Sequence, residues 1–297
     1  MSYEGKLLLD FQNHWGNLRE LLHTWKYSRV TKLKSQGWDI EYYSPWICEN
    51  KDLSKRVELH LIDDKKILSN NPFFIQTLIQ IYKTETDKPL GLLNQRTSSF
   101  LYRPVQDVTS KTLEIFEQAH HLVCQSKLKS LYLDFIQKII PLEEPGTQKS
   151  TGIGFSTIRS LGVVFLSLPN VAQDNQAYDL AINLAHELGH QCLYFLQLGD
   201  QIIDPNFNEN IFSTIRNEYR PPIMALHGLV ALTFINTMIE ELLTRRGLNF
   251  IQRRFLEERS NLYRRLYHTA AIEFIDCPLT PFGQNLVNEI YEHSLVI

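Results

Sequence analysis

Cysteine is scarce in this chain, and the cysteines that are present follow no pattern. Cys48, Cys124, Cys192 and Cys277 are scattered over 297 positions, with no C-x-x-C pair among them. Disulfide-rich secreted domains and thiolate metal sites both need regularly spaced cysteines. The spacing therefore argues against both, and it indicates reduced thiols in a cytoplasmic protein.

Long apolar runs and an excess of basic charge are also missing. No uninterrupted apolar run of about 18 residues is present, so we expect no membrane span. The apolar segment Leu7–Leu9 stops at Asp10 and has no basic segment before it, so we expect no signal peptide. A net charge of −3 and a pI of about 6.4 offer no electrostatic surface for nucleic acid or an anionic membrane.

Apolar residues are plentiful, and a boundary within the chain can be suggested. Hydrophobic residues make up 43% of the sequence, enough for one large core or two smaller ones. Pro141–Ser150 is polar and rich in turn formers, which is typical of a linker. We therefore predict an N-terminal helical region over residues 1–145, a candidate for peptide recognition. A second region follows over residues 146–297.

Local signals in the N-terminal region predict mainly helices. Residues 7–26 have amphipathic spacing, Lys55–Ile62 has the length of a short helix, and Pro72–Tyr82 begins with a helix-starting proline. Thr109–Ile140 is expected to be a long helical segment, with a break near Gln125–Lys129.

The second region is predicted to be mostly α-helical with a small β-hairpin or sheet. Thr151–Ile158 and Gly162–Leu168 have the composition of two paired strands. Residues 200–220 are polar and are expected to form a loop. Four helices are predicted, which run from Asp174 or Asn175 to Gly199, from Pro221 to Arg246, from Arg253 to Ile275 and from Pro281 to His293.

The first of these helices contains the H-E-x-x-H motif His186-Glu-Leu-Gly-His190. Histidines four residues apart lie one above the other on a helix, so both imidazoles can reach one metal ion beside Glu187. Two core histidines bonded to backbone carbonyls are the alternative. Gly189 within the motif predicts a close approach, either of a neighbouring helix or of a substrate.

A third protein ligand is needed if positions are to stay open for water or substrate. His227, which follows His190 by 37 residues, and Glu218, nine residues before His227, are the candidates near the start of the second long helix. Glu240 and Glu241 lie about 20 Å further along that helix and cannot share an ion with His227. A solvated or salt-bridged face is the expected role of that glutamate pair.

Two chemistries compete for a site between these two long helices. With zinc, Glu187 would act as the general base that deprotonates a bound water for attack on a peptide, as in a metallopeptidase. With Fe(II), three protein ligands would leave positions for a 2-oxo acid and O₂. No histidine is followed two positions later by Asp or Glu, so the usual iron signature is missing and spacing alone favours zinc.

A wider set of residues carries a resemblance to a known family. The motif, the preceding block Ser150–Ile158, the element Arg220-Pro-Pro-Ile-Met-Ala-Leu-His227 and the closing Leu279–Gly283 resemble the HExxH-motif proteins of ribosomally synthesised, post-translationally modified peptide (RiPP) pathways. The resemblance covers residues 150–290 well and the first 140 residues loosely. It implies an Fe(II)- and 2-oxoglutarate-dependent peptide β-hydroxylase that acts on a precursor peptide.

The same resemblance implies roles for single residues. His186, His190 and His227 would bind Fe(II). Arg220, or else Arg216, would hold the carboxylate of 2-oxoglutarate with a guanidinium group. A surface or helix-capping role is the alternative for either arginine.

Two further alternatives stay open at this point. Glu187 would orient a ligand or a water in the hydroxylase, instead of acting as a base. The strand Gly152–Ser156 either binds an extended peptide by edge pairing or packs as a small hairpin under the motif helix. A non-catalytic scaffold with a closed metal site would need a fourth protein ligand, and the sequence contains no clear one.

Overall fold

The computed structural model describes residues 59–62, 66–69, 103–104, 109–136, 138–143, 154–156, 162–168, 171–199 and 201–294. Helices predominate in this part of the chain and are joined by a small sheet, so the predicted fold class is confirmed. The helices predicted at residues 7–26 and Pro72–Tyr82 lie outside the described residues.

The described strands form one mixed sheet and one separate hairpin. The sheet has the order β1 (Leu59–Ile62), β2 (Lys66–Ser69), β4 (Lys138–Glu143), β6 (Val163–Ser167) and β5 (Gly154–Phe155), and β3 (Arg103–Pro104) also pairs with β4. Strands β2, β4 and β6 run parallel, whereas β5 is antiparallel to β6 as the sequence predicted. Strand β6 is buried along its length, as expected for a strand covered on both faces.

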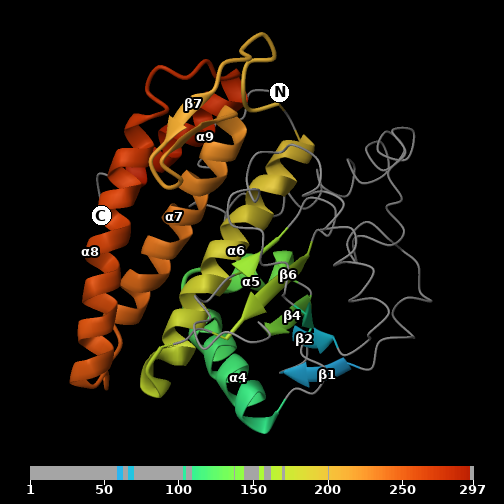
Figure 1. The fold of residues 1–297 in the computed structure, drawn as a ribbon, viewed down its shortest axis with the longest axis vertical. Helices are drawn as coiled ribbons and strands as arrows, with labels where there is room; N and C mark the ends of the chain where they lie inside the picture. Colours follow the sequence, from blue (N-terminus) through green and yellow to red (C-terminus); the bar gives the residue numbers. More distant parts are fainter. Residues whose placement is uncertain are drawn as a thin grey trace.

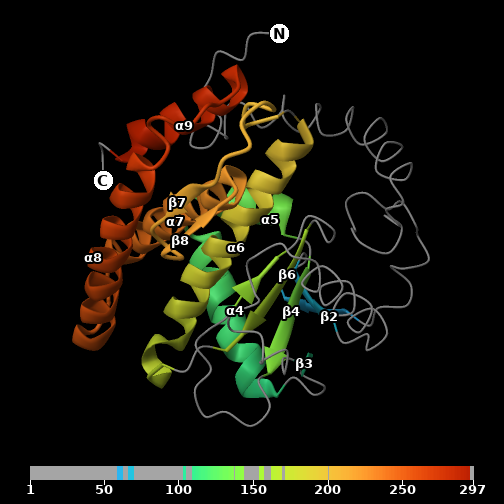
Figure 2. The same cartoon turned by 45° about the horizontal axis from the view of Figure 1, so that its top comes forward.

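The helices are stacked outward from the sheet. The bounds are Ser110–Cys124 for α4, Lys129–Phe135 for α5, Gln176–Gly199 for α6, Pro222–Leu243 for α7, Phe250–Ile272 for α8 and Pro281–Ser294 for α9. Helix α6 contacts β5 and β6, α7 packs on α6, and α8 packs on α7 (Figure 1). A view turned by 45° shows the same succession, with α4 against α6 (Figure 2). The two central helices are therefore α6, which carries the motif, and α7.

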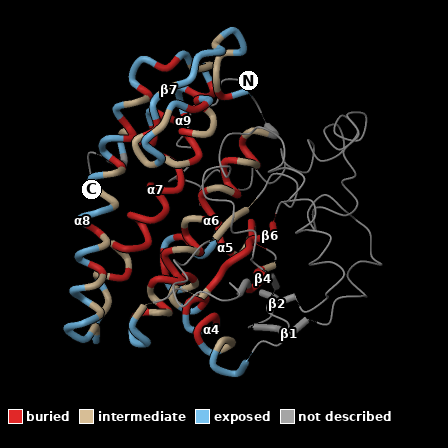
Figure 3. The backbone as a smooth tube through the Cα atoms, viewed as in Figure 1, coloured by how far each residue is buried: buried red, intermediate tan, exposed pale blue. Residues whose placement is uncertain are grey.

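Helix α7 is buried almost all round. From Ala225 to Ile239 nearly every residue is buried, so its apolar residues surround the helix instead of forming one stripe (Figure 3). By length and mean hydropathy alone, this helix would suffice for a membrane span. However, 83% of the most apolar window is buried inside the protein, which is the setting of a core helix.

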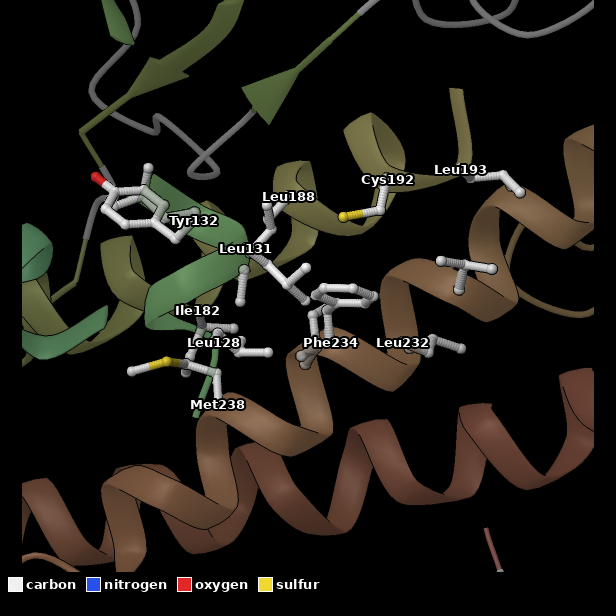
Figure 4. Packing of buried hydrophobic residues seen from close by; sticks show 14 of the residues in the cluster. Leu128, Leu131, Tyr132, Ile182, Leu188, Cys192, Leu193, Leu232, Phe234 and Met238 are labelled. Carbon is white, nitrogen blue, oxygen red and sulfur yellow. The ribbon is translucent and has the colours of Figure 1, made fainter. Parts of the chain in front are cut away.

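Helices α5, α6 and α7 meet in one apolar cluster. Leu131, Leu188 and Phe234, one from each helix, gather between them (Figure 4). Gly189 allows the close approach of α6 and α7, because a Cβ atom there would lie 3.0 Å from the Cα atom of Ala231. Of the two expectations for this glycine, close helix packing is the one that the structure supports.

Two helix predictions are wrong where the chain joins the sheet. Leu59–Ile62 is strand β1 and not the end of a helix. The segment predicted as Thr109–Ile140 does break after Cys124, but its helix ends at Phe135, and Lys138–Glu143 forms β4. Pairing with β2 and β6, which are distant in sequence, decides the conformation of this apolar segment.

The loop predicted over residues 200–220 contains a hairpin. Strand β7 (Ile211–Ser213) pairs with β8 (Glu218–Arg220), and Asn217 in the turn has a positive φ of 53°. Asparagine tolerates this conformation better than most residues. The hairpin leads directly into α7 and places Arg220 next to it.

The predicted division between residues 145 and 146 remains a prediction. Strand β4 precedes this point, yet it pairs with β6, which follows it. Helices α4 and α5 likewise pack on α6. Elements from both sides of the predicted boundary thus share one sheet and one apolar cluster.

Candidate functional site

The three predicted histidines lie in one cluster between α6 and α7. The rings of His186 and His190 meet edge-on, with 4.6 Å between their centroids. The Nδ1 atoms of His190 and His227 are 3.1 Å apart, and the two ring centroids are separated by 5.2 Å. The structure therefore brings His227 to the motif, across the close contact of the two helices.

The Nδ1 atoms of His190 and His227 lie within hydrogen-bond distance of each other, and the same separation fits two ligands of one metal ion. Two nitrogens that each lie about 2.1 Å from an ion, at an angle of about 90–110°, are about 3.0–3.4 Å apart. Burial and the nearby Arg220 lower the pKa of His227 to about 3. Desolvation, followed by the charge of His186, lowers the pKa of His190 well below its ordinary value. Both imidazoles are thus neutral near pH 7, the form that binds metals.

His186 would be a suitable third ligand by residue type, but its ring nitrogens do not lie beside those of His190 and His227 as three ligands of one ion would. Its Nδ1 atom is 3.1 Å from Oε1 of Glu187. If Nδ1 carries the proton and donates to Glu187, the lone pair lies on Nε2. In the part of the chain that the structure describes, no three His, Cys, Asp or Glu side chains are gathered closely enough to hold an ion. The site is thus a nitrogen pair with a third imidazole beside it.

Glu187 is fully buried, and both of its carboxylate oxygens have partners. Oε1 contacts Nδ1 of His186, and Oε2 accepts a hydrogen bond of 2.8 Å from Oγ of Ser156. Burial raises the pKa of this carboxyl group, but the hydrogen bonds and the charges of His186 and His190 outweigh burial, so the net pKa is lowered. The geometry suits a carboxylate that orients other groups.

Strand β5 comes close to Glu187 because residue 154 is glycine. A Cβ atom on Gly154 would lie 2.7 Å from Oε1 of Glu187 and 2.6 Å from Cδ2 of Leu166. Ser156 follows the strand directly and thereby reaches the carboxylate. Glycine within a strand permits this close approach of the backbone.

Tyr194 is a further residue of the site that the sequence analysis did not single out. Its ring centroid lies 4.4 Å from that of His227, and its hydroxyl donates to the carbonyl oxygen of Ser156 at 3.3 Å. Tyr194 follows His190 by four residues, as His190 follows His186, so all three share one face of α6. That spacing was the available signal.

Arg220 is a buried cation next to the histidine cluster. Its side chain is 6% exposed, and Nε lies 3.2 Å from Oε1 of Glu218. Its Nη2 atom is buried and has no hydrogen-bond partner among the described residues. Burial, followed by the charge of Arg216, lowers the pKa to about 10 against the opposing effect of Glu218, so the group stays cationic at pH 7. A buried guanidinium with an unmatched N–H group is suited to bind an anion.

The structure distinguishes between the alternatives for the third ligand. Glu218 contacts Arg220 rather than the imidazoles, whereas His227 contacts His190. Arg216 is exposed in the turn before β8, and its charge lowers the pKa of both His190 and Arg220. His227 is therefore the better placed ligand candidate, and Arg220 the better placed anion-binding arginine.

The glutamate pair near the end of α7 has the expected structural role. Glu240 forms an ion pair with Arg264 at 3.2 Å, and Glu241 forms one with Lys127 at 3.1 Å.

Comparison with known proteins identifies no family for this chain. No family model matches the sequence, and no curated protein matches it.

Proposed function

We propose that this protein is an Fe(II)- and 2-oxoglutarate-dependent dioxygenase that hydroxylates a side-chain β-carbon of a ribosomally made peptide in a RiPP pathway. The observation that carries the proposal is the buried Nη2 atom of Arg220, which has no partner beside the histidine cluster. A 2-oxo acid brings a carboxylate that a guanidinium can bind through two hydrogen bonds. The neutral amide attacked by an endopeptidase or aminopeptidase does not require such a group.

The reaction balances without a further reductant. The peptide C–H group, O₂ and 2-oxoglutarate give the peptide alcohol, succinate and CO₂, with one oxygen atom entering the alcohol and one entering succinate. Bound Fe(II) would supply the activation of O₂. The protein would supply the binding groups, their orientation and the exclusion of water.

Each residue of the site has a separate task in this proposal. His186, His190 and His227 are the metal ligands, and the lowered pKa values of His190 and His227 keep two of them neutral. Arg220 binds a carboxylate of 2-oxoglutarate, with Glu218 holding its Nε atom. Apolar residues of α6 and α7 pack on one side of the site and keep water from that side, whereas the side chain of His186 is 33% exposed.

Glu187 would have a supporting role. Its Oε1 and Oε2 atoms are engaged by His186 and Ser156, and its side chain has no exposed surface. Supporting carboxylates of this kind fix the tautomer and the ring orientation of a metal-binding histidine. In the alternative function, a zinc metallopeptidase, Glu187 would need a free oxygen facing a bound water.

The cellular setting follows from the proposed chemistry and from the cysteines. Cys192 and Cys277 are free thiols. Free thiols and an Fe(II) cofactor both suit a reducing compartment. We place the protein in the cytoplasm, with a precursor peptide as its partner and no nucleic acid or membrane.

A direct test begins with the co-substrate, because it needs no knowledge of the peptide. The protein is reconstituted anaerobically with Fe(II) and titrated with 2-oxoglutarate, and the charge-transfer absorption of the bound 2-oxo acid is recorded. Admission of air should then give succinate. Addition of a peptide library should give products heavier by one oxygen atom, identified by tandem mass spectrometry.

The same samples distinguish the alternatives. Peptide cleavage with zinc, independent of 2-oxoglutarate, would establish the metallopeptidase and exclude the hydroxylase. Glu187→Gln should abolish activity in a metallopeptidase, whereas a hydroxylase should retain part of it. A metal ion bound by four protein ligands, with no position open for substrate, would indicate a non-catalytic scaffold. The absence of a stoichiometric metal ion would indicate the same.

A further inference from the structure

Ser156, the residue directly after β5, contacts through different atoms the two residues that flank the histidine cluster. Its Oγ atom donates to Oε2 of Glu187 at 2.8 Å, and its carbonyl oxygen accepts from the Tyr194 hydroxyl at 3.3 Å. We infer that Ser156 is a positioning residue that holds His186 through Glu187 and His227 through Tyr194. The inference rests on the proposed function only in so far as it takes these histidines to be metal ligands.

The first connection runs through the side chain of Ser156. Oε2 of Glu187 is anchored by the serine hydroxyl, and this leaves Oε1 directed at Nδ1 of His186, 3.1 Å away. A carboxylate held at this position selects the tautomer with the proton on Nδ1 and the lone pair on Nε2. Because Glu187 is fully buried, water cannot replace the serine hydroxyl without rearrangement.

The second connection runs through the backbone of Ser156. The Tyr194 ring lies against His227, with 4.4 Å between the centroids and 51° between the ring planes. Its hydroxyl is directed to the Ser156 carbonyl oxygen, so the phenol ring spans the distance between β5 and His227. A ring held at both ends restricts the rotation of the imidazole beside it.

The sheet holds Ser156 itself in place. Gly154 pairs with Leu166 and Phe155 with Phe165 in the register of β5 and β6. The rings of Phe155 and Phe165 are stacked, with centroids 4.3 Å apart. Histidines from two different helices are thus oriented relative to one strand, and Ser156 is the residue that makes both connections.

The test compares variants of Ser156 in the full-length protein. Ser156→Ala removes the hydroxyl, Ser156→Thr keeps it, and Ser260→Ala removes a buried hydroxyl on α8 as the matched control. Outer-shell substitutions typically weaken metal binding by about 10–100-fold. We expect a loss in that range for Ser156→Ala in Co(II) titrations followed by absorption, and recovery to within about threefold of the wild type for Ser156→Thr.

A second measurement tests the same inference without a metal. Selective ¹⁵N labelling of histidine reports which ring nitrogen of His186 carries the proton in the metal-free protein. We expect the Nδ1–H tautomer to predominate in the wild type and in Ser156→Thr, and to lose its predominance in Ser156→Ala.

The outcomes separate this inference from the proposed function. An unchanged His186 tautomer in Ser156→Ala overturns the positioning role, and so does an equal loss of Co(II) affinity in Ser156→Thr and Ser156→Ala. A wild-type protein that binds no stoichiometric metal overturns the proposed function instead. In that case the tautomer of His186 still decides the role of Ser156.

Discussion

At the scale of single residues, the two buried charged side chains of the candidate site are the most informative feature. Glu187 and Arg220 are both buried, but their surroundings differ. Both oxygens of Glu187 have partners within the protein, whereas Arg220 has Glu218 on Nε and leaves Nη2 unmatched. A buried charged group without a partner is costly, so the unmatched nitrogen points to a ligand.

Substitution of this arginine should therefore affect the co-substrate more than the fold. Arg220→Lys keeps the charge but removes the planar pair of donors, and hydrogen bonds to charged groups contribute about 1.5–3 kcal/mol. We expect the affinity of the Fe(II)-loaded protein for 2-oxoglutarate to fall by about 10–150-fold, as measured by anaerobic titration.

Arg216→Lys is the matched control, because Arg216 is exposed. Its effect on 2-oxoglutarate affinity should stay within about threefold, or about 0.7 kcal/mol. An equal loss in both variants would mean that general positive charge, and not the Arg220 guanidinium, binds the co-substrate.

At the scale of helices, the contact between α6 and α7 positions the histidines. Gly189 and His190 are adjacent in the chain. The close approach of α6 to α7 at Gly189 therefore sets the distance between His190 and His227. Gly189→Ala would improve helix propensity by about 1 kcal/mol. The added Cβ atom, however, meets the backbone of Ala231 at 3.0 Å, and backbone atoms cannot easily move aside.

We therefore expect Gly189→Ala to destabilise the protein by about 1–3 kcal/mol, the usual cost of overpacking. Because α6 and α7 would separate, the variant should also bind metal more weakly, which urea unfolding and Co(II) titration would measure together. Gly247→Ala provides the comparison. Its φ of +90° predicts some strain, but its surroundings are open, so metal affinity should not change. Equal metal affinities in both variants would contradict the role of this contact.

Helices α8 and α9 are joined by hydrogen bonds from two tyrosine hydroxyls. Tyr267 donates to the carbonyl oxygen of Ile290 at 2.5 Å, and Tyr291 donates to that of Ala271 at 2.7 Å. Burial raises the pKa of Tyr267 above its ordinary value of 10. Above about pH 10 the unfolded chain thus loses the phenol proton while the folded protein keeps it, so stability falls as pH rises.

Tyr267→Phe should lose about 1 kcal/mol at pH 7, because the Ile290 carbonyl loses its donor. The difference in unfolding free energy between the wild type and the variant should shrink above about pH 10, by at most about 1.4 kcal/mol per pH unit. Urea unfolding at a series of pH values measures both effects. Tyr219→Phe, at a position 72% exposed, should show neither effect. A difference that stays constant with pH would disprove the assignment to Tyr267.

At the scale of the whole molecule, the sheet connects the two predicted regions. Strand β4, from the N-terminal side, covers one edge of β6, every residue of which is buried. Helix α4 covers part of α6 in the same way. A fragment of residues 146–297 would expose these surfaces and leave β6 with an unpaired edge.

We expect this fragment not to fold alone, even though it contains every proposed metal ligand. The measurements are circular dichroism and urea unfolding of residues 146–297, with the full-length chain as the comparison. A monomeric fragment with a cooperative unfolding transition would instead support two independent domains with a boundary near residue 145.

Local signals in the sequence predicted the four helices from α6 to α9 close to their observed bounds. Pro222 lies at the start of α7, and Gly247 follows its end with a positive φ. The capping box of Asn249 and Gln252, which starts α8 at Phe250 and not at the predicted Arg253, was missed. These effects act within a few residues, so they can be read from the chain directly. Strand β4 and the hairpin of β7 and β8 were missed, because their pairing depends on partners or turns that the local composition does not reveal.

For the candidate site, the sequence by itself determined that two imidazoles share one face of a helix, because a spacing of four residues means about one turn, and that a carboxylate lies beside them. Only the tertiary structure decided that His227 joins them, that Glu218 pairs with Arg220, and that Ser156 reaches Glu187. These contacts join segments separated by about 30 residues or more, or depend on how a hairpin folds. Packing between α6, α7 and the sheet, and not local propensity, selects them.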